Sequence, residues 1–596
     1  MNFEEIITQA VIGSVRELYQ SEIGAESVTL QKTKKEFEGD FTLVVFPFLK
    51  MSRCKPDETA RQLGEKLMEK LPFLENFNVI KGFLNLSLRD GEWLSFLQTE
   101  ATDTGYGHRK AAADAQPVLI EFSSPNTNKP LHLGHVRNNL LGDSVSRILE
   151  ADGNRVVKVN LVNDRGIHIC KSMIAWLKYG NGETPESSGM KGDHLVGKYY
   201  VEFDKHYKTE MKELMEKGMD EEEAGKKAPI LLEAQAMLRK WEEGDTEVRG
   251  LWEKMNRWVY EGFDATYRMM GISFNKIYYE SNTYLLGKEI VKEGLDKKVF
   301  YHHSDGSVRI DLQADGLDEK VLLRSDGTSV YMTQDLGTAL TRYNEYHPSR
   351  MIYVVGNEQN YHFDVLKLIL GKKLDYDWGK TIYHLSYGMV ELPSGKMKSR
   401  EGTVVDADDL MESMVSMAAE NTAQLGKTEF TAEEAARLAE TVGLGALKYF
   451  ILKVDPKKNM LFNPNESIDL NGNTAPFIQY THARIRSLLN KAEFRLDESR
   501  PLAADMELGA PEKEIIRNLY DYPANVRQAA QDFSPALIAN YTYELAKSYN
   551  RFYQECSILR ESDEQKRLLR LFISAFTADV IRRAMGLLGI DVPDRM

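Results

Sequence analysis

The sequence predicts an α/β protein, with a Rossmann-type parallel sheet that carries a helical insertion, an N-terminal α+β domain and an all-α C-terminal domain. Three observations predict this fold class. Short apolar runs alternate with amphipathic helical stretches from Pro117 onwards, which is the pattern of βαβ units. A charged, helical stretch interrupts that alternation from about residue 185 to residue 300. From about Thr431 to the end of the chain the pattern is helical.

The N-terminal domain is predicted over residues 1–112. A helical period over Phe3–Tyr19 precedes the strand-like run "GDFTLVVFPF", residues 39–48. A second helix is predicted over residues 57–71, and a further strand over residues 79–88. The small residues of "AAADAQ" then indicate a linker to the next domain.

A βαβ unit opens the second domain, which is predicted over residues 113–425. "PVLIEF" reads as a buried parallel strand, and "RVVKVNLV" reads as the next one. Between them lies an amphipathic helix that Gly153 ends. Its apolar face comprises Val136, Leu140, Leu141, Val145, Ile148 and Leu149. After the insertion the sheet is predicted to resume with the strands "RMIYVVG" and "TIYHLSYGMVEL", separated by the helix "YHFDVLKLILG".

The all-α domain is predicted over residues 426–596. Thr431 stands three residues before Glu434, which is the spacing of a helix capping box. The later stretch "LIANYTYELAKSYNRFYQE" has a strong helical period and many tyrosines.

The composition excludes several classes of protein. The three cysteines lie far apart without a CxxC pair, which argues against a disulfide framework and a structural zinc site. The N-terminus has acids where a secretory signal has bases, and no uncharged apolar run approaches the roughly 18 residues of a membrane span. We therefore expect a cytoplasmic protein with no membrane partner. The net charge of −14 argues against a nucleic-acid partner on average. Two basic stretches, 30–37 and 481–495, stand out, although such stretches are more often solvated helix faces.

The stretch "SPNTNKPLHLGH" lies between a predicted strand end and a predicted helix start. Ligands bind at this position in open α/β sheets, and a helix N-terminus attracts phosphate. His132 and His135 are three residues apart, so they lie on one side of the helix. Gly134 between them lets a flat ring approach the backbone. The alternative is a pair of capping histidines without a ligand.

A second basic motif, "KMKSR", follows the last predicted strand in a glycine-flanked stretch. A basic loop at this place can neutralise charge that develops on a leaving pyrophosphate. Alone, such a loop is usually a solvated turn. The HxGH motif at the first strand end together with a KM-type loop after the last strand is a specific combination.

These two motifs resemble the signatures of class I aminoacyl-tRNA synthetases. The longer stretch "EFSSPNTNKPLHLGHVRNN" resembles the arginyl-tRNA synthetase form of the first signature. "YMTQDLGTAL", "VVGNEQNYHF", "FIQYTHARIRSLL" and the final "PDRM" resemble the later motifs of that family, in the family's order. The resemblance covers nearly the whole chain and is weaker in the first hundred residues and over 185–260. It implies an enzyme that activates L-arginine with ATP and transfers it to the 3′ end of tRNA(Arg) for protein synthesis.

The resemblance implies an arginine pocket. A guanidinium is planar, always charged and rich in donors, so its pocket needs a carboxylate and neutral acceptors. Tyr331 and Asp335 are four residues apart and share a face if they are helical. Asp335 is expected to take the guanidinium, with Tyr331 beside it. Gln359 and Asn126 match family contacts to the substrate, and Glu121 is expected to face a cationic group of it.

The resemblance also implies an ATP site. The side chains expected to act in catalysis, by stabilising charge on the phosphates, are Lys129, His132, His135 and Lys396. The residues expected to bind ATP are His132, Gly134, His135, Gly388, Met389, Val390, Lys396 and Met397, of which the "YGMV" stretch would receive the adenine. Mg²⁺ would travel with the ATP phosphates.

The second signature departs from the family. The general class I motif reads Lys-Met-Ser-Lys-Ser, and many arginyl enzymes have "KMSTR" instead. Ser399 and Arg400 fit the arginyl form, whereas Lys398 fits neither. Lys398 either replaces the missing charge or points to solvent. Lys129, just ahead of HxGH, is expected to restore that charge at the phosphates.

The tRNA-binding parts follow from the resemblance alone. The helical C-terminal domain resembles the anticodon-binding domain of the family, with Tyr480, His482, Arg484 and Met596 in matching motifs. Aromatic rings beside arginines suit stacking on splayed bases. The N-terminal domain with "KEFEGDF" resembles the domain that touches the tRNA elbow. A monomer is expected.

Two rival interpretations remain open at this point. The first is a class I enzyme for another amino acid. A cysteinyl enzyme would need zinc-binding cysteines, and a glutamyl enzyme would need a cationic pocket, against which Asp335 argues. The second rival is a non-catalytic tRNA-binding paralogue. The intact His132, His135, Lys396, Tyr331 and Asp335 argue against it.

Overall fold

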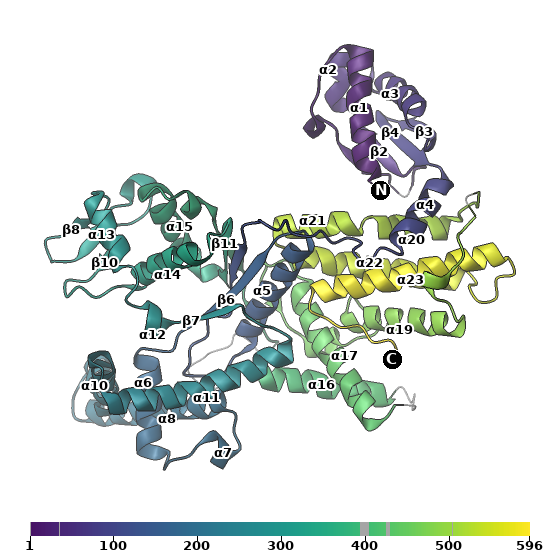
Figure 1. Cartoon of the computed structure of the whole chain (residues 1–596). Coiled ribbons are helices and arrows are strands. Elements are labelled where there is room, and N and C mark those ends of the chain that lie inside the picture. The colour runs from purple at the N-terminus through teal and green to yellow at the C-terminus, as the bar shows by residue number, and fades with distance from the viewer. Residues whose placement is uncertain (1, 35, 394–404, 425–429, 504) are drawn as a thin grey trace. The chain divides into compact units, whose positions relative to one another are not determined.

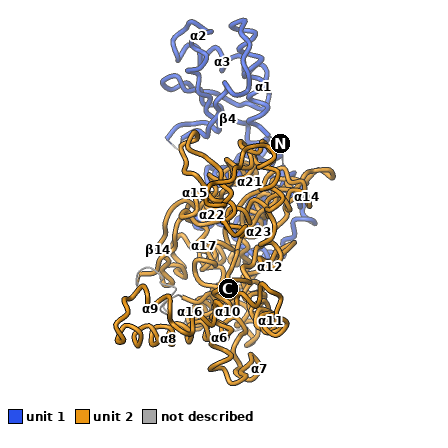
Figure 2. The backbone as a smooth tube through the Cα atoms, turned by 90° about the vertical axis from the view of Figure 1, so that its left-hand side faces the viewer, with its two compact units in different colours: residues 1–106, 485–522, 547–580 blue, residues 107–484, 523–546, 581–596 orange. Residues whose placement is uncertain are grey.

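The computed structural model describes all residues except 1, 35, 394–404, 425–429 and 504 (Figure 1). The chain divides into two compact units, drawn in two colours in Figure 2. Unit 1 comprises residues 1–106, 485–522 and 547–580. Unit 2 comprises residues 107–484, 523–546 and 581–596. The domain boundaries predicted after residues 112 and 425 stay predictions.

Unit 1 contains a four-stranded antiparallel sheet in the order β1-β2-β4-β3. Its strands are β1 (Leu30–Lys32), β2 (Phe41–Val44), β3 (Leu74–Ile80) and β4 (Phe83–Leu88). The helices of the same part of the chain are α1 (Phe3–Tyr19), α2 (Leu49–Ser52), α3 (Pro56–Lys70) and α4 (Asp90–Glu100). The two helices predicted here are confirmed. The single strand predicted over residues 79–88 is wrong, because the chain turns at Lys81 and Gly82, which have φ of 51° and 80°.

An aromatic cluster closes the core of unit 1 with a residue from far along the chain. Tyr520 ends α20 (Ala510–Tyr520), and its ring lies 5.6 Å from that of Trp93 and 5.5 Å from that of Phe3. The Tyr520 hydroxyl accepts a hydrogen bond from the Phe3 N–H at 2.8 Å. The Trp93–Tyr520 contact is edge-to-face, and such a contact adds about 0.5–1.5 kcal/mol beyond the area that it buries.

Unit 2 contains the predicted parallel sheet. Its five strands run in the order β12-β11-β5-β6-β7, and every neighbouring pair is parallel. They are β5 (Val118–Glu121), β6 (Val156–Val162), β7 (Lys276–Tyr279), β11 (Arg350–Gly356) and β12 (Ile382–Tyr387). Helix α5 (Leu133–Ala151) connects β5 to β6, as the βαβ pattern predicted. The fold class predicted from the sequence is confirmed.

Helices fill most of the stretch predicted as an insertion. They are α7 (Pro185–Ser188), α8 (Gly192–Glu216), α9 (Glu221–Lys227), α10 (Pro229–Glu243) and α11 (Thr246–Met270), and α6 (Ile167–Tyr179) precedes them. The predicted extent to residue 300 is too long, because residues 276–279 form β7 of the main sheet. Helices α12 (Glu280–Thr283) and α13 (Lys288–Asp296) follow β7.

A small antiparallel sheet in the order β10-β9-β8 follows these helices and was missed in the sequence. Its strands β8 (Tyr301–His302), β9 (Val308–Ile310) and β10 (Lys320–Leu323) are only two to four residues long. Such strands are too short to show the alternation that predicts longer ones. Helix α14 (Tyr331–Tyr346) leads into β11, and α15 (Asn360–Leu368) connects β11 to β12.

The remaining chain is mostly helical, as predicted. Its helices are α16 (Ala407–Gln424), α17 (Ala432–Leu452), α18 (Pro464–Ser467), α19 (Ala475–Lys491), α20, α21 (Tyr522–Asp532), α22 (Pro535–Glu555) and α23 (Glu564–Leu587). The exception is a two-stranded sheet of β13 (Val390–Glu391) and β14 (Met460–Leu461). The capping box at α17 is confirmed, because Thr431 and Glu434 exchange backbone-to-side-chain hydrogen bonds. Within the described parts of the chain, no helix is long and apolar enough to cross a bilayer.

Candidate active site

His132 and His135 lie at the start of α5, just beyond the carboxyl end of β5. His132 is the N-cap residue, and its Nδ1 accepts a hydrogen bond from the Gly134 N–H at 3.1 Å. The His132 N–H in turn donates to Nδ1 of His135 at 3.2 Å. The histidines therefore do cap the helix, as the alternative interpretation held. The cap uses Nδ1 of both rings, so it leaves Nε2 as the atom through which each ring would contact a phosphate.

Both histidines are neutral at pH 7. Burial, helped by the charge of Lys129, lowers the pKa of His132 to about 4. Burial also lowers the pKa of His135 well below its usual value, with smaller contributions from His132 and Lys129. Because each Nδ1 accepts a hydrogen bond, the single proton of each neutral ring lies on Nε2. The pair can thus donate two hydrogen bonds to phosphate oxygens.

Lys129 lies in the same stretch, and the insertion helix α8 passes close to it. Burial lowers the pKa of the Lys129 ammonium. A Cβ atom at Gly197 of α8 would lie 2.8 Å from Cδ of Pro130 and 3.6 Å from Cα of Lys129. Since the Pro130 contact is shorter than side chains tolerate, glycine permits this approach of the helix to the backbone. The insertion thus supports the stretch that carries Lys129.

The second signature is joined to the first through the residues that follow it. Lys396, Met397 and Lys398 lie outside the described residues. Val405, however, accepts a hydrogen bond from the Leu133 N–H at 3.1 Å, and the Ala407 N–H donates to the Leu131 carbonyl at 3.0 Å. This short antiparallel pairing is centred on His132 and Asp406. The chain that leaves the second signature therefore runs directly beside the HLGH motif.

The predicted adenine-binding stretch is held by Arg137, which the sequence analysis missed. The fully buried guanidinium of Arg137 donates to the Gly388 carbonyl at 2.7 Å and to the Met389 carbonyl at 3.0 Å. It also donates to the Pro456 and Lys458 carbonyls. Gly388 has no room for a side chain, since a Cβ would lie 2.5 Å from the Lys458 backbone. Val390 begins β13 and is buried.

Tyr331 and Asp335 lie in the first turns of α14, so the predicted helix and their shared face are observed. Tyr331 is the first helical residue and is 77% exposed. Asp335 accepts a hydrogen bond at 2.6 Å from Nε2 of His362 on α15. Gln359 is exposed at the start of the same helix. The structure thus brings α14 and α15 together at this point. His362, inside the motif "NYHF", was missed.

The predicted contacts Glu121 and Asn126 have partners within the chain. Glu121 ends β5 and forms an ion pair with the fully buried Arg342 of α14. Its other oxygen accepts a hydrogen bond from the Ser124 hydroxyl at 3.2 Å. Asn126 is exposed and forms a backbone bridge with Asn163. The negative charge of Glu121 is therefore already balanced, so its expected contact with a cationic substrate stays a prediction.

Glu280 is a further acid that the sequence analysis missed. It directly follows β7 and begins α12. Burial, together with the negative charges of Asp164 and Asp335 and against the effect of Arg165, raises the pKa of its carboxyl to about 7. Two carboxylates, Glu280 and Asp335, therefore interact electrostatically. In the sequence "YYESNT" nothing distinguishes Glu280 from a surface acid.

The predicted tRNA-binding residues lie on α19 and at the C-terminus. The guanidinium of Arg484 lies over the ring of Tyr480, 4.9 Å from its centre. His482 is buried, and its Nδ1 lies 2.9 Å from the Pro593 carbonyl oxygen, so this histidine fixes the end of the chain. Met596 is partly exposed. The structure places Tyr480 and Arg484 together and leaves their role untested.

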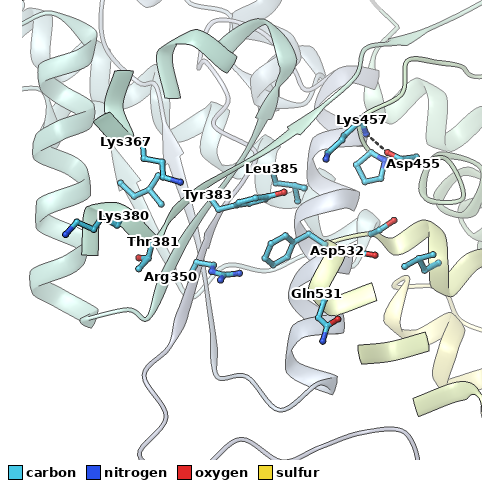
Figure 3. Close-up of a pocket in the computed structure, with 15 residues that line it drawn as sticks. Arg350, Lys367, Lys380, Thr381, Tyr383, Leu385, Asp455, Lys457, Gln531 and Asp532 are labelled. Carbon is cyan, nitrogen blue, oxygen red and sulfur yellow. Dashed lines mark hydrogen bonds between the residues drawn. The ribbon is translucent and has the colours of Figure 1, made fainter. Parts of the chain in front are cut away.

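A pocket of about 580 Å³ lies beside the edge strand β12 (Figure 3). Arg350 and Lys380 line it near the amino ends of β11 and β12, together with Phe533 after α21. None of the predicted site residues that the structure describes lines this pocket. Because all strands of the sheet are parallel, its amino-end position sets it apart from His132 and His135, which follow a carboxyl end.

Comparisons with known proteins agree with this geometry. Residues 99–463 match the family "tRNA synthetases class I (R), catalytic domain", and residues 478–596 match the "DALR anticodon binding domain". The chain is 61% identical to the arginine–tRNA ligase of Bacteroides thetaiotaomicron and 56% identical to that of Porphyromonas gingivalis, over the full length of each. Its fold is similar to the Thermus thermophilus arginyl-tRNA synthetase structure, with a TM-score of 0.79 at 22% identity and full coverage of both chains. The chain therefore belongs to the arginyl-tRNA synthetases, the class I enzymes that ligate arginine to tRNA.

Proposed function

We propose that the described surface around His132 is where this arginine–tRNA ligase forms arginyl-adenylate. An oxygen of the arginine carboxylate attacks the α-phosphorus of ATP, and the bond to the β-phosphate breaks to release pyrophosphate. A terminal ribose hydroxyl of tRNA(Arg) then attacks the activated carbonyl, and AMP leaves. The observation that carries this proposal is the pairing of Val405 and Ala407 with Leu133 and Leu131. It supports the approach of both signatures to one ATP molecule.

The phosphates would be held by neutral donors and by positive charges. His132 and His135 supply Nε2–H donors without adding charge, whereas Lys129 and Lys396 supply positive charge where negative charge develops. The adenine would lie at the backbone of Gly388, Met389 and Val390, which Arg137 supports. Mg²⁺ would accompany the ATP phosphates, and no structural zinc is part of the proposal.

The arginine side chain would lie between α14, α15 and α12. Asp335 offers a carboxylate to the guanidinium fork, Tyr331 offers a hydroxyl, and Glu280 offers a second acid nearby. Gln359, Asn126 and Glu121 are proposed contacts to the remainder of the substrate. An acidic pocket of this kind favours a cationic amino acid such as arginine over acidic and uncharged ones.

The tRNA-binding assignments and the cellular setting are proposals as well. Tyr480, Arg484 and Met596 are proposed to contact the anticodon region, and the N-terminal domain the tRNA elbow. The position of Arg484 over the ring of Tyr480 supports the proposed contact with the anticodon region, since both groups can stack on unpaired bases. We also propose that the enzyme is a cytoplasmic monomer.

Arginine-dependent ATP–pyrophosphate exchange, measured with and without tRNA(Arg), tests this function. We expect exchange with arginine in the presence of tRNA, and none with glutamate or cysteine. Absence of arginine-dependent exchange under both conditions would contradict the proposal. It would favour a non-catalytic tRNA-binding role instead.

The pKa of Glu280 predicts a pH dependence of arginine binding. A carboxyl that titrates at about 7 is mostly protonated at pH 6 and ionised at pH 8. Only the ionised form attracts a guanidinium, so the KM for arginine should fall about tenfold between these pH values. In Glu280→Gln this slope should disappear and the KM should stay high. The conservative control Glu293→Gln, on α13, should keep the slope. A slope that survives in Glu280→Gln would exclude this carboxyl as its source.

A further inference from the structure

A cluster of charged side chains joins the insertion to the residues that follow the second signature. Lys191, the N-cap residue of α8, forms an ion pair with Asp408 at the start of α16. His194 lies one turn further along α8, and its Nε2 lies 3.1 Å from Asp408 and 3.4 Å from Asp406. Thr266 of α11 donates to Asp408 at 2.8 Å and accepts from Lys191 at 2.6 Å. We call these five residues the α8–α16 cluster.

The cluster holds the short chain segment that is paired with the first signature. Asp406 accepts the Asp408 N–H at 2.8 Å and so begins α16, while its own backbone forms the bridge with His132. Any movement of the Asp406–Asp408 segment therefore changes the pairing with the HLGH motif.

Helix α8 also contacts the first signature independently. Lys191, His194 and Gly197 follow one another at intervals of three residues, so they form one stripe of the helix. Gly197 is the residue whose missing side chain admits Pro130, just before the HLGH motif. One face of one insertion helix thus contacts both the stretch before the HLGH motif and the described residues that follow the second signature.

The cluster already contains a positively charged group, the Lys191 ammonium. Ligand-type atoms of Asp193, His194 and Asp408 lie within 4.8 Å of one another, as they would around a metal ion. However, the Lys191 ammonium is paired with Asp408 and lies 3.3 Å from the fully buried Asp193. A buried ion cluster with its positive charge supplied by the chain explains the arrangement without a metal ion.

We propose that Lys191 and His194 are positioning residues for adenylate formation: they hold the start of α16 against the first signature and so keep the HLGH motif in place for ATP. The insertion therefore takes part in ATP binding without touching ATP. This inference rests on the proposed ATP-site role of His132. Displacements of about 1 Å in such supporting groups can lower rates by up to about 100-fold.

The variant Lys191→Met tests this role, with Lys198→Met as the matched control. Lys198 lies on the same helix and pairs with Glu183, away from α16. In pyrophosphate exchange with tRNA present, we expect Lys191→Met to raise the KM for ATP about tenfold and to lower kcat, with the KM for arginine within about twofold of wild type. Lys198→Met should match wild type in all three constants.

Thermal unfolding and a double-mutant cycle separate positioning from stability. If Lys191→Met only lowers the melting temperature and keeps the kinetic constants of Lys198→Met at 25 °C, the proposal is wrong. Lys191→Met combined with Asp408→Asn should cost little more than Asp408→Asn alone, because Asp408→Asn already breaks the ion pair that Lys191→Met removes. Additive effects would contradict the proposal. A wild-type chain without arginine-dependent exchange would instead overturn the proposed function.

The pH profile of ATP binding gives a readout that a purely structural role would not change. Hydrogen bonding to Asp408, with the charges of Asp406 and Asp193, raises the pKa of His194 against burial and Lys191. A raised histidine pKa means that the protonated, holding form persists below that pKa and is lost as the pH rises through it. The KM for ATP should therefore increase as the pH rises above the usual titration range of a histidine and through the raised pKa of His194. His194→Gln should remove the increase, and an unchanged profile in that variant would refute the role of His194.

Discussion

Asp335→Asn is expected to raise the KM for arginine about 30- to 100-fold and to leave the KM for ATP within about twofold of wild type. The reason is the geometry of the guanidinium, which pairs its fork of donors with a carboxylate. An amide keeps the size of the side chain and loses the charge. A hydrogen bond to a charged group contributes about 1.5–3 kcal/mol, which corresponds to about 13- to 160-fold and so includes this range.

The hydrogen bond between Asp335 and His362 requires its own control. It joins α14 to α15 at 2.6 Å, so loss of the carboxylate could also disturb the packing of these helices. His362→Gln retains a donor and should change the KM for arginine far less than Asp335→Asn does. Equal increases in the constants for arginine and ATP in Asp335→Asn would point to a structural role. Steady-state exchange at several concentrations of each substrate decides between these outcomes.

Lys129→Ala is expected to lower the kcat of pyrophosphate exchange by about 100- to 1000-fold, the range that follows when a group stabilising transition-state charge is removed. Ser399 stands where most class I enzymes have their second lysine, so the phosphates depend more on Lys129. Burial lowers the pKa of the Lys129 ammonium, because few solvent molecules screen it, and the same burial strengthens its attraction to a phosphate.

Binding of tRNA separates this catalytic role from a general defect. Lys129→Ala should bind tRNA(Arg) with nearly wild-type affinity and should have a nearly wild-type melting temperature. The control Lys178→Ala removes an exposed lysine that pairs with Glu233 and should retain full exchange activity. Near-normal exchange in Lys129→Ala would contradict a catalytic role for this residue.

The long periodic elements could be predicted from the sequence because each carries its own signal. The helix Phe3–Tyr19 and the strands around α5 follow from apolar spacing over many residues. The hairpin at Lys81 and Gly82 was missed because its two strands and its turn together read as one apolar run. Strand β7 of the parallel sheet was missed because it lies in a region that was predicted to be helical. A strand of four residues has too little periodicity to be recognised there.

The site residues that lie within one contiguous motif could be predicted from the sequence. Those whose partners come from distant parts of the chain were missed. His132, Gly134 and His135 share one turn of chain, so their spacing is informative. Arg137 lies only two residues further, yet its partners are carbonyls about 250 to 320 residues away along the chain. Glu280 is exceptional only through burial and through the charges around it. Neither the burial of a side chain nor the charges around it can be predicted from the local sequence.

The position of Tyr520 has a consequence for folding of the protein during its synthesis on the ribosome. Phe3 and Trp93 belong to the first segment of unit 1, which ends at residue 106. Tyr520, whose ring completes their cluster, is synthesised 414 residues after that end. At about 5–20 residues per second, the nascent N-terminal segment waits roughly 20–80 s for it. During this interval the segment carries an incomplete apolar core, which is the kind of surface that chaperones bind. Synthesis rate and chaperone supply, more than final stability, should therefore govern the yield of the active enzyme.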